Sequence, residues 1–354
     1  MLAIAALAVL AYLPSLQGEF ILDDSRTIED NPRIRHVWPR SLGEVLHPRA
    51  VADITFALNY AAAGLNPVDY RAVNVALHLA AALVLFALCL RLPVGRERDV
   101  SDASRARRAL LALLIAALWV VHPLTTSAVT YVSQRYEVLM SLFYLLTLYG
   151  VLRCGEGRHA LGWGTLAVAS GLLGMLTKPV MMTVPIAALA LDRTYLAASW
   201  RDLLRKRGWV HLLLFALTAL PPLAMSRAVG SATELAGRYG GHVSPAYLMT
   251  QSEVILHYLR LAVWPYPLCI DYAWPAAGGL ADVLPSFVVV AFLAGAALAG
   301  MVYGPKAAFP LFCFFVVLAP TSSLFPRPDA AFEHRMYLPL AAVLAGVVMA
   351  VARI

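Results

Sequence analysis

Residues 137–192 decide the fold, because they hold three long apolar runs with only two short breaks: EVLMSLFYLLTLYGVLRCGEGRHALGWGTLAVASGLLGMLTKPVMMTVPIAALALD. The runs cover 137–152, 161–177 and 180–192, and the breaks contain RCGEGRH and TKP. A helix needs about 20 mostly apolar residues to cross a bilayer. The stretch therefore predicts consecutive membrane helices that are joined by tight hairpins.

The whole chain is rich in apolar residues and poor in charged ones. Of its 354 residues 60% are hydrophobic and 14% are charged, and the mean hydropathy is +0.71. Soluble domains have about 45–50% apolar and about 25% charged residues, so a soluble domain, a disordered chain and a disulfide scaffold are excluded. We expect one all-α polytopic membrane domain over residues 1–354. About ten spans are expected, at 2–20, 72–90, 109–121, 137–152, 161–177, 180–192, 209–226, 283–303, 308–324 and 336–352.

Basic residues are concentrated in alternate loops. They gather at 91–108, 153–158 and 193–207, and single ones follow at Lys306 and Arg353. Short loops rich in Lys and Arg face the cytoplasm, and these loops share that side if both termini lie there too. The net charge of +7 is then a topology signal and does not indicate nucleic-acid binding. We predict a multi-pass protein of a bacterial inner membrane, with cytoplasmic termini and a periplasmic active site.

The outer side of the membrane then receives two long segments, 21–71 and 227–282. Within the second, residues 246–263 form an amphipathic pattern, and charged side chains such as Arg260 argue against a full span. We expect this helix to lie on the outer interface, with a second one at 51–63. Three short outer segments are expected at 122–136, 178–179 and 325–335.

Ionisable residues from five separate segments converge on this outer side. Such groups are costly near a membrane unless they are paired or used, so each one is a functional candidate. Their convergence is stronger evidence than any single residue. The set is Asp23, Asp24, Arg26, His122, Arg135, Glu137, Lys178, Asp271, Glu333, His334 and Arg335.

Each of these residues also has a structural interpretation. Asp23 and Asp24 could supply a general base or oxygen ligands for a divalent ion, but an Asp-Asp-Ser sequence is also typical of a turn or a helix cap. Arg135 could bind a phosphate through its planar fork, or it could pair with Glu137 as a buried ion pair. His122, which precedes a proline, could be a satisfied polar cap.

Lys178 lies in a hairpin that is otherwise uncharged, and it opposes the positive-inside trend. An anionic substrate or a carboxylate partner would explain it, as would snorkelling to lipid headgroups. Asp271 could simply be a solvated loop acid. Glu333, His334 and Arg335 place an acid, an imidazole and a guanidinium side by side at a membrane boundary.

Several loose motifs follow one another along the chain. They are Phe20-Ile21-Leu22-Asp23-Asp24 with Ile28 and Asn31-Pro32; Leu58-Asn59-Tyr60 with Asn74 and His78; His122-Pro123 with Val132-Ser133-Gln134-Arg135; Lys178-Pro179; Leu248-Met249-Thr250-Gln251 with Tyr258-Leu259-Arg260-Leu261; Asp271-Tyr272; and Glu333-His334-Arg335-Met336-Tyr337-Leu338-Pro339.

Their order resembles that of a known family, the transmembrane and tetratricopeptide-repeat O-mannosyltransferases and their bacterial relatives. The resemblance covers nearly the whole chain, and it implies a GT-C glycosyltransferase that moves a sugar from a polyprenyl-phosphate carrier at the outer face. The family's first-loop acid pair would fall on Asp23 and Asp24.

Two features depart from that pattern. The repeats, which lie on the active-site side in the family, do not follow the tenth run, and an eleventh span would be needed to reach them. The chain is therefore either a piece of a longer protein or a stand-alone catalytic unit. Many relatives have an acid before the proline, where this chain has Lys178. The resemblance therefore assigns no role to an acid next to this position.

The implied reaction is an inverting transfer. The acid pair takes the proton of an acceptor hydroxyl, with Asp24 favoured over Asp23, and cations stabilise the lipid phosphate that leaves. We expect Arg135, Lys178, Arg335 and His334 to bind the donor phosphate. We expect no required metal, although the acid pair could hold a divalent cation. The residues expected around the substrate are His122, Glu137, Asp271, Tyr272 and Glu333.

Other functions share these features. A flippase for a polyprenyl-linked sugar would use the same basic groove, and an oligosaccharyltransferase or glycan ligase would use a larger donor. A non-catalytic scaffold would leave the outer charges unexplained. The expected partners are the lipid-linked donor, a protein or glycan acceptor and the bilayer; the sugar, the acceptor and the oligomeric state are not encoded in any pattern that we recognise.

Overall fold

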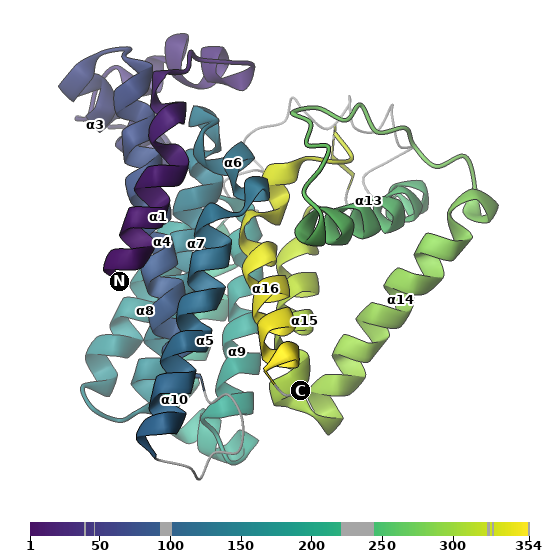
Figure 1. Ribbon diagram of the computed structural model, residues 1–354. Coiled ribbons are helices and arrows are strands. Elements are labelled where there is room, and N and C mark those ends of the chain that lie inside the picture. Colours follow the sequence, from purple (N-terminus) through teal and green to yellow (C-terminus); the bar gives the residue numbers. More distant parts are fainter. Residues whose placement is uncertain are drawn as a thin grey trace.

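The computed structural model describes residues 1–38, 40–45, 47–92, 101–220, 244–323, 326–327 and 329–352. Every regular element within these ranges is helical (Figure 1). The longer helices are α1 (Leu2–Tyr12), α3 (Ala50–Ala63), α4 (Pro67–Arg91), α5 (Asp102–Val121), α6 (Pro123–Val129), α7 (Arg135–Gly155), α8 (Ala160–Met175), α9 (Val184–Tyr195), α10 (Trp200–Leu217), α13 (Pro245–Val263), α14 (Leu280–Tyr303), α15 (Pro305–Leu318) and α16 (Tyr337–Val351). Short turns of helix are η1 (Leu13–Gln17), η2 (Ser25–Glu29), η3 (Pro32–Ile34), α2 (Leu42–Val45), η4 (Val132–Gln134), η5 (Pro179–Thr183) and η6 (Glu333–Met336).

The predicted all-α polytopic fold is confirmed, but the number of spans is not. Within the described residues, four helices are long and apolar enough to cross a membrane, namely Pro67–Arg91, Val132–Gly155, Leu280–Tyr303 and Glu333–Val351. A fifth span results if α5 and α6 count together, although they bend by 60°. Other apolar helices are shorter. The expected count of about ten therefore stays a prediction.

Prolines and capping residues set the helix boundaries near the predicted outer side. Asn66 caps α4 and Pro67 opens it, because proline fits the first turn, where no N–H donor is needed. His122 ends α5, and its side chain accepts a hydrogen bond from the backbone N–H of Leu124 at the start of α6. The helices therefore break where the candidate residues lie.

One helix extends well before its apolar run. The run at 209–226 predicted a membrane span, and the helix that contains its first part, α10, already begins at Trp200. Its first turns are basic, and the buried Arg207 is neutralised by Asp192 of α9, with both N–O distances at 2.7 Å. A search for apolar runs overlooks a turn whose charge is compensated by a neighbouring helix. Residues 221–226 of that run lie outside the described ranges.

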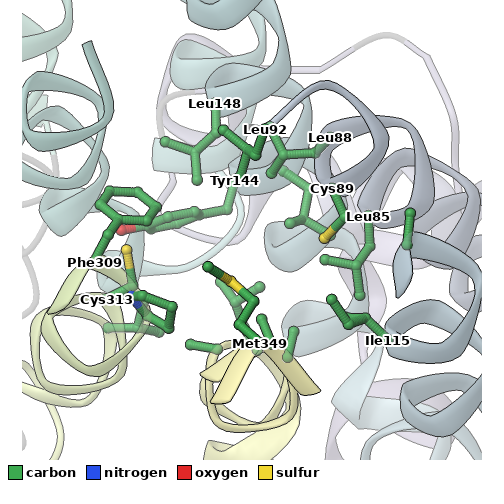
Figure 2. Close-up of a pocket in the computed structure, with 18 of the residues that line it drawn as sticks. Leu85, Leu88, Cys89, Leu92, Ile115, Tyr144, Leu148, Phe309, Cys313 and Met349 are labelled. Atoms are coloured by element: carbon green, nitrogen blue, oxygen red, sulfur yellow. The ribbon is translucent and has the colours of Figure 1, made fainter. Parts of the chain in front are cut away.

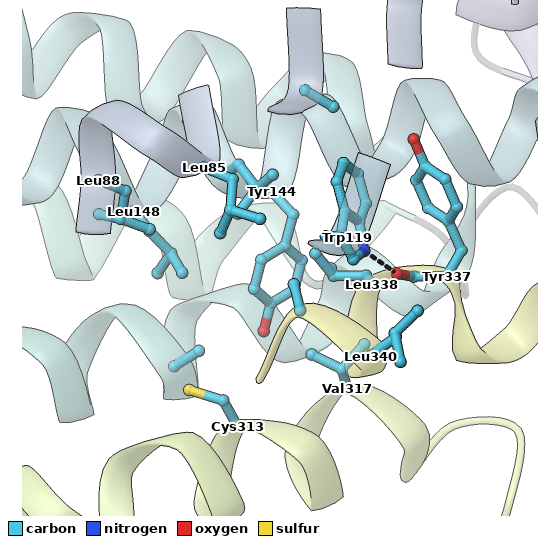
Figure 3. Packing of buried hydrophobic residues seen from close by; sticks show 14 of the residues in the cluster. Leu85, Leu88, Trp119, Tyr144, Leu148, Cys313, Val317, Tyr337, Leu338 and Leu340 are labelled. Carbon is cyan, nitrogen blue, oxygen red and sulfur yellow. Dashed lines mark hydrogen bonds between the residues drawn. The ribbon is translucent and has the colours of Figure 1, made fainter. Parts of the chain in front are cut away.

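The core of the bundle is aromatic and tightly packed. The indole N–H of Trp119 on α5 donates to the backbone oxygen of Tyr337 at 2.8 Å, and the two rings lie 4.8 Å apart (Figure 3). The imidazole of His78 on α4 joins this group through the Tyr337 hydroxyl at 2.6 Å. These contacts fix α4, α5 and α16 to one another.

Two helices depart from the parallel bundle. The helix α13 runs across the direction of α15 and α16, and α14 slants away beside it (Figure 1). The helix at 246–263 is thus present as α13, and the one at 51–63 as α3, which covers one end of the bundle. Their place at a membrane interface stays a prediction. The outer segment 227–282 is described only from residue 244 onward.

An apolar cavity of about 90 Å³ lies inside the bundle among α4, α5, α7, α15 and α16. Leu88, Tyr144, Phe309 and Cys313 surround it, as Figure 2 shows. Leu88 belongs to the last turns of α4, so the cavity lies toward the end of the bundle opposite α3.

Candidate functional site

A larger cavity, of about 380 Å³, opens at the end of the bundle that α3 covers. We call it the cationic cavity. Five segments that are far apart in the sequence line it, and four of the predicted site residues are among them. The lining residues are Asp23, Thr27, His47, Pro48, Arg49, Ser133, Gln134, Tyr136, Lys178, Pro179, Val180, Thr321, Arg327, Phe332, His334 and Arg335.

Positive side chains outnumber negative ones in the lining of this cavity. Arg49, Lys178, Arg327 and Arg335 are cations, whereas Asp23 is the one carboxylate among the residues that line the cavity. Guanidinium and ammonium groups form strong charge-assisted hydrogen bonds with phosphate and carboxylate oxygens. The cavity is therefore suited to an anionic group with a single acid beside it.

Asp23 and Asp24 occupy different surroundings. Asp24 is fully buried, and its two carboxylate oxygens accept the backbone N–H groups of Ser133 at 2.7 Å and of Ile21 at 3.2 Å. Burial raises the pKa of the Asp24 carboxyl. Asp23 is exposed and lines the cavity, while its backbone N–H donates to the hydroxyl of Tyr131 at 2.8 Å. Asp24 thus ties the first loop to η4, and Asp23 presents the available carboxylate.

Lys178 has the carboxylate partner that its position suggested. It follows α8 in an extended conformation, and its ammonium forms an ion pair with the buried carboxylate of Glu137 on α7. It also lines the cavity. Burial lowers the pKa of Lys178, although the charge of Glu137 opposes this effect. Glu137 therefore holds the cation in place at the edge of the cavity.

The segment 329–335 contributes two more predicted residues. The guanidinium of Arg335 donates to the backbone oxygens of Ala330 at 2.8 Å and Asp329 at 2.7 Å. The ring of His334 stacks on Phe332 with 5.0 Å between the ring centres. Both side chains are therefore positioned by their own loop as well as by η6.

Arg135 does not reach the cavity. Its guanidinium is completely buried, where it donates to Asn74 Oδ1 at 2.7 Å and to the Tyr70 backbone oxygen at 2.9 Å, and it lies 4.3 Å from the ring centre of Phe56. The expected pair with Glu137 is also not formed, because residues two apart on a helix point in different directions. Arg135 instead joins α3, α4 and α7 beneath the cavity.

Four other predicted residues do not line the cavity. Glu333 accepts the hydroxyl of Tyr272 at 2.7 Å, and Asp271 is an exposed loop acid that accepts the backbone N–H of Ala273 at 2.9 Å. His122 caps α6, and its Nε2 lies 3.2 Å from the backbone oxygen of Ala262 on α13. The Glu333 contact joins the loop after α13 to η6, and the His122 contact joins α13 to the break between α5 and α6.

Two cations of the cavity were missed by the sequence analysis. Arg49 precedes α3 and lies 4.6 Å over the ring centre of Tyr136. Arg327 belongs to the predicted outer loop, and its buried Nε has no hydrogen-bond partner among the described residues. The positive-inside argument used for Lys178 applies equally to Arg327 and could have found it. Nothing in the sequence around Arg49 distinguishes it from other basic residues of the first loop.

The residues present do not form an obvious metal site. No group of three His, Cys, Asp or Glu side chains within the described ranges could hold an ion together. Both Asp24 oxygens accept backbone N–H groups, which leaves Asp23 as a lone carboxylate. A divalent cation at this pair stays a prediction.

Comparisons with known proteins agree with the sequence motifs. Residues 103–225 match the sequence model of the dolichyl-phosphate-mannose-protein mannosyltransferase family. The chain is 29% identical to human protein O-mannosyl-transferase TMTC4 over 52% of its length, and 33% identical to human TMTC1 over 40%. It is 27% identical to protein O-mannosyl-transferase F38B6.6 of Caenorhabditis elegans over 77% of its length. These matches span 28%, 17% and 39% of the respective relatives.

One solved structure shares the fold. The crystal structure of ArnT from Cupriavidus metallidurans bound to undecaprenyl phosphate matches 98% of this chain and 59% of ArnT, with a TM-score of 0.50 and 16% sequence identity. At this identity the match is evidence for the fold only. The chain is thus similar in sequence to protein O-mannosyl-transferases and similar in fold to ArnT.

Proposed function

We propose that the protein is a membrane glycosyltransferase that moves a sugar from a polyprenyl-phosphate carrier to an acceptor hydroxyl in the cationic cavity. The observation that carries this proposal is the single carboxylate, Asp23, among four cations in one cavity. The similarity to O-mannosyltransferases and the fold shared with ArnT support it. The proposal assigns the base to Asp23 instead of Asp24, which the sequence had favoured.

The reaction needs a base and stabilisation of a leaving phosphate. The acceptor oxygen forms a bond to the anomeric carbon while the bond from that carbon to the phosphate oxygen breaks, which inverts the carbon. Asp23 takes the acceptor proton, because a hydroxyl is a poor nucleophile until it loses that proton. The donor phosphodiester carries one negative charge and the released phosphate gains another.

The cations act on this growing charge. Preorganised cations near the phosphate lower the barrier because their attraction increases as the charge develops. Lys178, Arg327 and Arg335 are assigned to the phosphate, with Arg49 completing the positive lining. Glu137 is a positioning residue, since it touches Lys178 and not the cavity. His334 is a candidate donor to the leaving oxygen.

The same proposal sets the orientation of the protein. The cavity would face the periplasm of a bacterial inner membrane, because the arginine-rich loops lie at the opposite end of the bundle. The acceptor would be a protein or a glycan, and the polyprenyl tail of the donor would lie in the bilayer. No metal takes part in the proposed step.

Two related functions have to be separated from this one. A flippase would move the lipid-linked sugar across the bilayer, yet the cationic and apolar cavities share no lining residue. A ligase with a diphosphate-linked donor could use the same four cations. A panel of monophosphate-linked and diphosphate-linked sugar donors distinguishes the second alternative.

The test is transfer of radiolabelled sugar from such a panel in liposomes. Asp23→Asn should lower transfer about 10²–10⁴-fold, the usual size of a general-base effect, and leave donor binding intact. Asp24→Asn should lower the melting temperature because it alters the carboxylate that accepts two backbone N–H groups. Asp30→Asn is the matched control, because Asp30 is an exposed acid of the same loop that does not line the cavity.

The proposal is rejected if Asp23→Asn retains full transfer with every donor. It is also rejected if the native protein consumes no donor but moves labelled lipid between leaflets, since the flippase alternative then applies. If Asp24→Asn remains folded and loses transfer while Asp23→Asn does not, the base is Asp24.

A further inference from the structure

One buried carboxylate beside the cationic cavity has no part in the proposed reaction. Asp53, in the first turn of α3, is only 3% exposed and does not line the cavity. Its Oδ1 accepts the hydroxyl of Tyr136 at 3.0 Å. A buried acid is costly unless it is hydrogen-bonded or paired, so this contact with a residue of the cavity lining is a candidate for a function.

Tyr136 connects Asp53 to a cation of the cavity. Asp53 holds the hydroxyl of Tyr136, and the guanidinium of Arg49 lies over the ring, 4.6 Å from its centre. A cation is attracted to the face of an aromatic ring, so the direction of the ring influences where the guanidinium lies. Tyr136 and Arg49 both line the cavity, and Asp53 lies behind them.

The backbone around Arg49 is fixed as well. Its carbonyl oxygen accepts the backbone N–H of Asp53 at 3.0 Å. The backbone N–H of Val51 donates to the backbone oxygen of Leu176 at 3.2 Å, which joins the start of α3 to the segment that leads to Lys178. With its backbone held on both sides, Arg49 keeps freedom mainly in its side chain, and Tyr136 is the contact that restricts it.

Asp53 could act on an anion in the cavity in two opposite ways. Burial raises the pKa of its carboxyl, and the charges of Arg33, Arg49 and Arg40 oppose this rise. When ionised, Asp53 would repel an anion and weaken its binding. Through Tyr136, however, it would place Arg49 toward the anion and strengthen binding. The two effects differ in sign, so a measurement can separate them.

We infer that Asp53 is a positioning residue for the donor phosphate, because through Tyr136 it holds Arg49 where the guanidinium contacts that phosphate. This inference rests on the proposed function, since it takes the cationic cavity as the donor site. It adds a residue that does not touch the donor, and it assigns Arg49 to the phosphate together with the other three cations. The positioning effect outweighs the repulsion by Asp53.

Binding of undecaprenyl phosphate to the full chain in detergent tests the inference. Tyr136→Phe keeps the ring but removes the hydroxyl that Asp53 holds, so the dissociation constant should rise about three- to tenfold. The control is Tyr60→Phe, because Tyr60 lies under the guanidinium of Arg35, 4.4 Å from the ring centre, and neither residue lines the cavity. This control should bind the probe as the native protein does.

Two substitutions of Asp53 separate position from charge. Asp53→Leu and Asp53→Asn remove the same negative charge, but Asn keeps an oxygen that can accept the hydroxyl of Tyr136. Asp53→Leu should weaken binding, and Asp53→Asn should bind the probe at least about threefold more tightly than Asp53→Leu. If both variants bind more tightly than the native protein and equally well, Asp53 acts only by its charge and the inference is overturned.

A double-mutant cycle separates positioning from a loss of folding. In an Arg49→Gln background, Tyr136→Phe should change the dissociation constant no further, because the guanidinium that the ring positions is gone. Effects of Arg49→Gln and Tyr136→Phe that multiply would overturn the inference. Thermal melting identifies any unfolded variant, and Tyr136→Phe decides the matter if Asp53→Leu does not fold.

Lys178→Gln tests the donor site itself, because Lys178 pairs with Glu137 and not with Asp53. If Lys178→Gln weakens binding of the probe but Tyr136→Phe does not, the inference fails and the proposed function stands. If the native protein does not bind the probe, or if Lys178→Gln binds it equally well, the assignment of the donor site fails and the inference fails with it.

Discussion

The surroundings of Lys178 disfavour the charged form of its side chain. Burial lowers its pKa below the ordinary value of a lysine, and Arg49 and Arg335 add to this effect, whereas the ion pair with Glu137 opposes it. The ammonium should therefore lose its proton at a lower pH than a free lysine, whose pKa is about 10.4. Because the proposed donor site needs the cation, donor binding should weaken as the pH rises through the lowered pKa.

The pH dependence of donor affinity measures this directly, from about pH 7 to about pH 10. Lys178→Arg is the informative variant, because a guanidinium stays charged over this range. This variant should lose less donor affinity than the native protein as the pH rises. An unchanged decline in Lys178→Arg would assign the titration to a different group.

Arg327 and Arg335 allow binding to be separated from folding. Arg327 Nε has no partner among the described residues, so Arg327→Gln should weaken donor binding about tenfold or more, in line with a charge-assisted hydrogen bond, without lowering the melting temperature. Arg335→Gln also removes donors to the backbone oxygens of Asp329 and Ala330, so it should lower both quantities. Equal melting temperatures for the two variants would contradict this distinction.

The sequence predicted which residues share the cavity end of the bundle, but not which way each side chain points. Asp23, Lys178, His334 and Arg335 line the cavity as part of the predicted outer set. Asp24 and Arg135 belong to the same predicted set but are buried, Asp24 with backbone partners and Arg135 with the side chain of Asn74 and the backbone of Tyr70. Membrane sidedness follows from charge counts along the chain, whereas the direction of adjacent side chains depends on packing that no local pattern encodes.

The contact between α7 and α8 depends on a glycine. A methyl group added at Gly150 would lie 2.9 Å from the backbone oxygen of Trp163 and 3.0 Å from the backbone nitrogen of Ala167. Backbone atoms cannot move aside as a side chain can, so Gly150→Ala should destabilise the bundle by about 1–3 kcal/mol.

The matched control is Gly162→Ala on α8, where a methyl group would meet nothing within 4 Å. It should change the stability by no more than about 1 kcal/mol, the helix preference of alanine over glycine. Thermal melting of both variants in the same detergent tests the pair. Equal effects would mean that the two helices do not pack as closely as described.

Helix positions were predicted well where proline or glycine breaks an apolar run. The hairpin at Lys178-Pro179 separates α8 from α9, and the pattern at 246–263 corresponds to α13, Pro245–Val263. The first turns of α10 lie outside the predicted apolar run, because a charged turn can be helical when another helix supplies the counter-charge. Such compensation is a property of pairs of elements and is not visible within one.

The orientation of the whole molecule can be tested with its own cysteines. Cys269 is exposed, whereas Cys89, Cys154 and Cys313 are buried. The backbone N–H of Cys269 donates to Glu333, next to His334 of the cationic cavity, so Cys269 reports on the side that this cavity faces. A membrane-impermeant maleimide should label intact cells at Cys269, and Cys269→Ser should abolish the label.

A reporter at the opposite end completes this test. Arg105→Cys in the Cys269→Ser background should react only after the membrane is made permeable, because the arginine-rich loop at 91–108 would face the cytoplasm. Labelling of Arg105→Cys in intact cells would reverse the proposed orientation.

The packed segment between the cationic cavity and the apolar cavity also has a consequence for the cell. Met336 and Tyr337 are fully buried, and they separate Arg335 of the cationic cavity from Leu338 of the apolar cavity along one segment. This packed segment therefore closes the inner end of the cationic cavity. If it works as proposed, a loaded carrier arrives and the spent carrier departs through the same opening, so the return of the empty lipid to the far leaflet has to be driven by separate machinery.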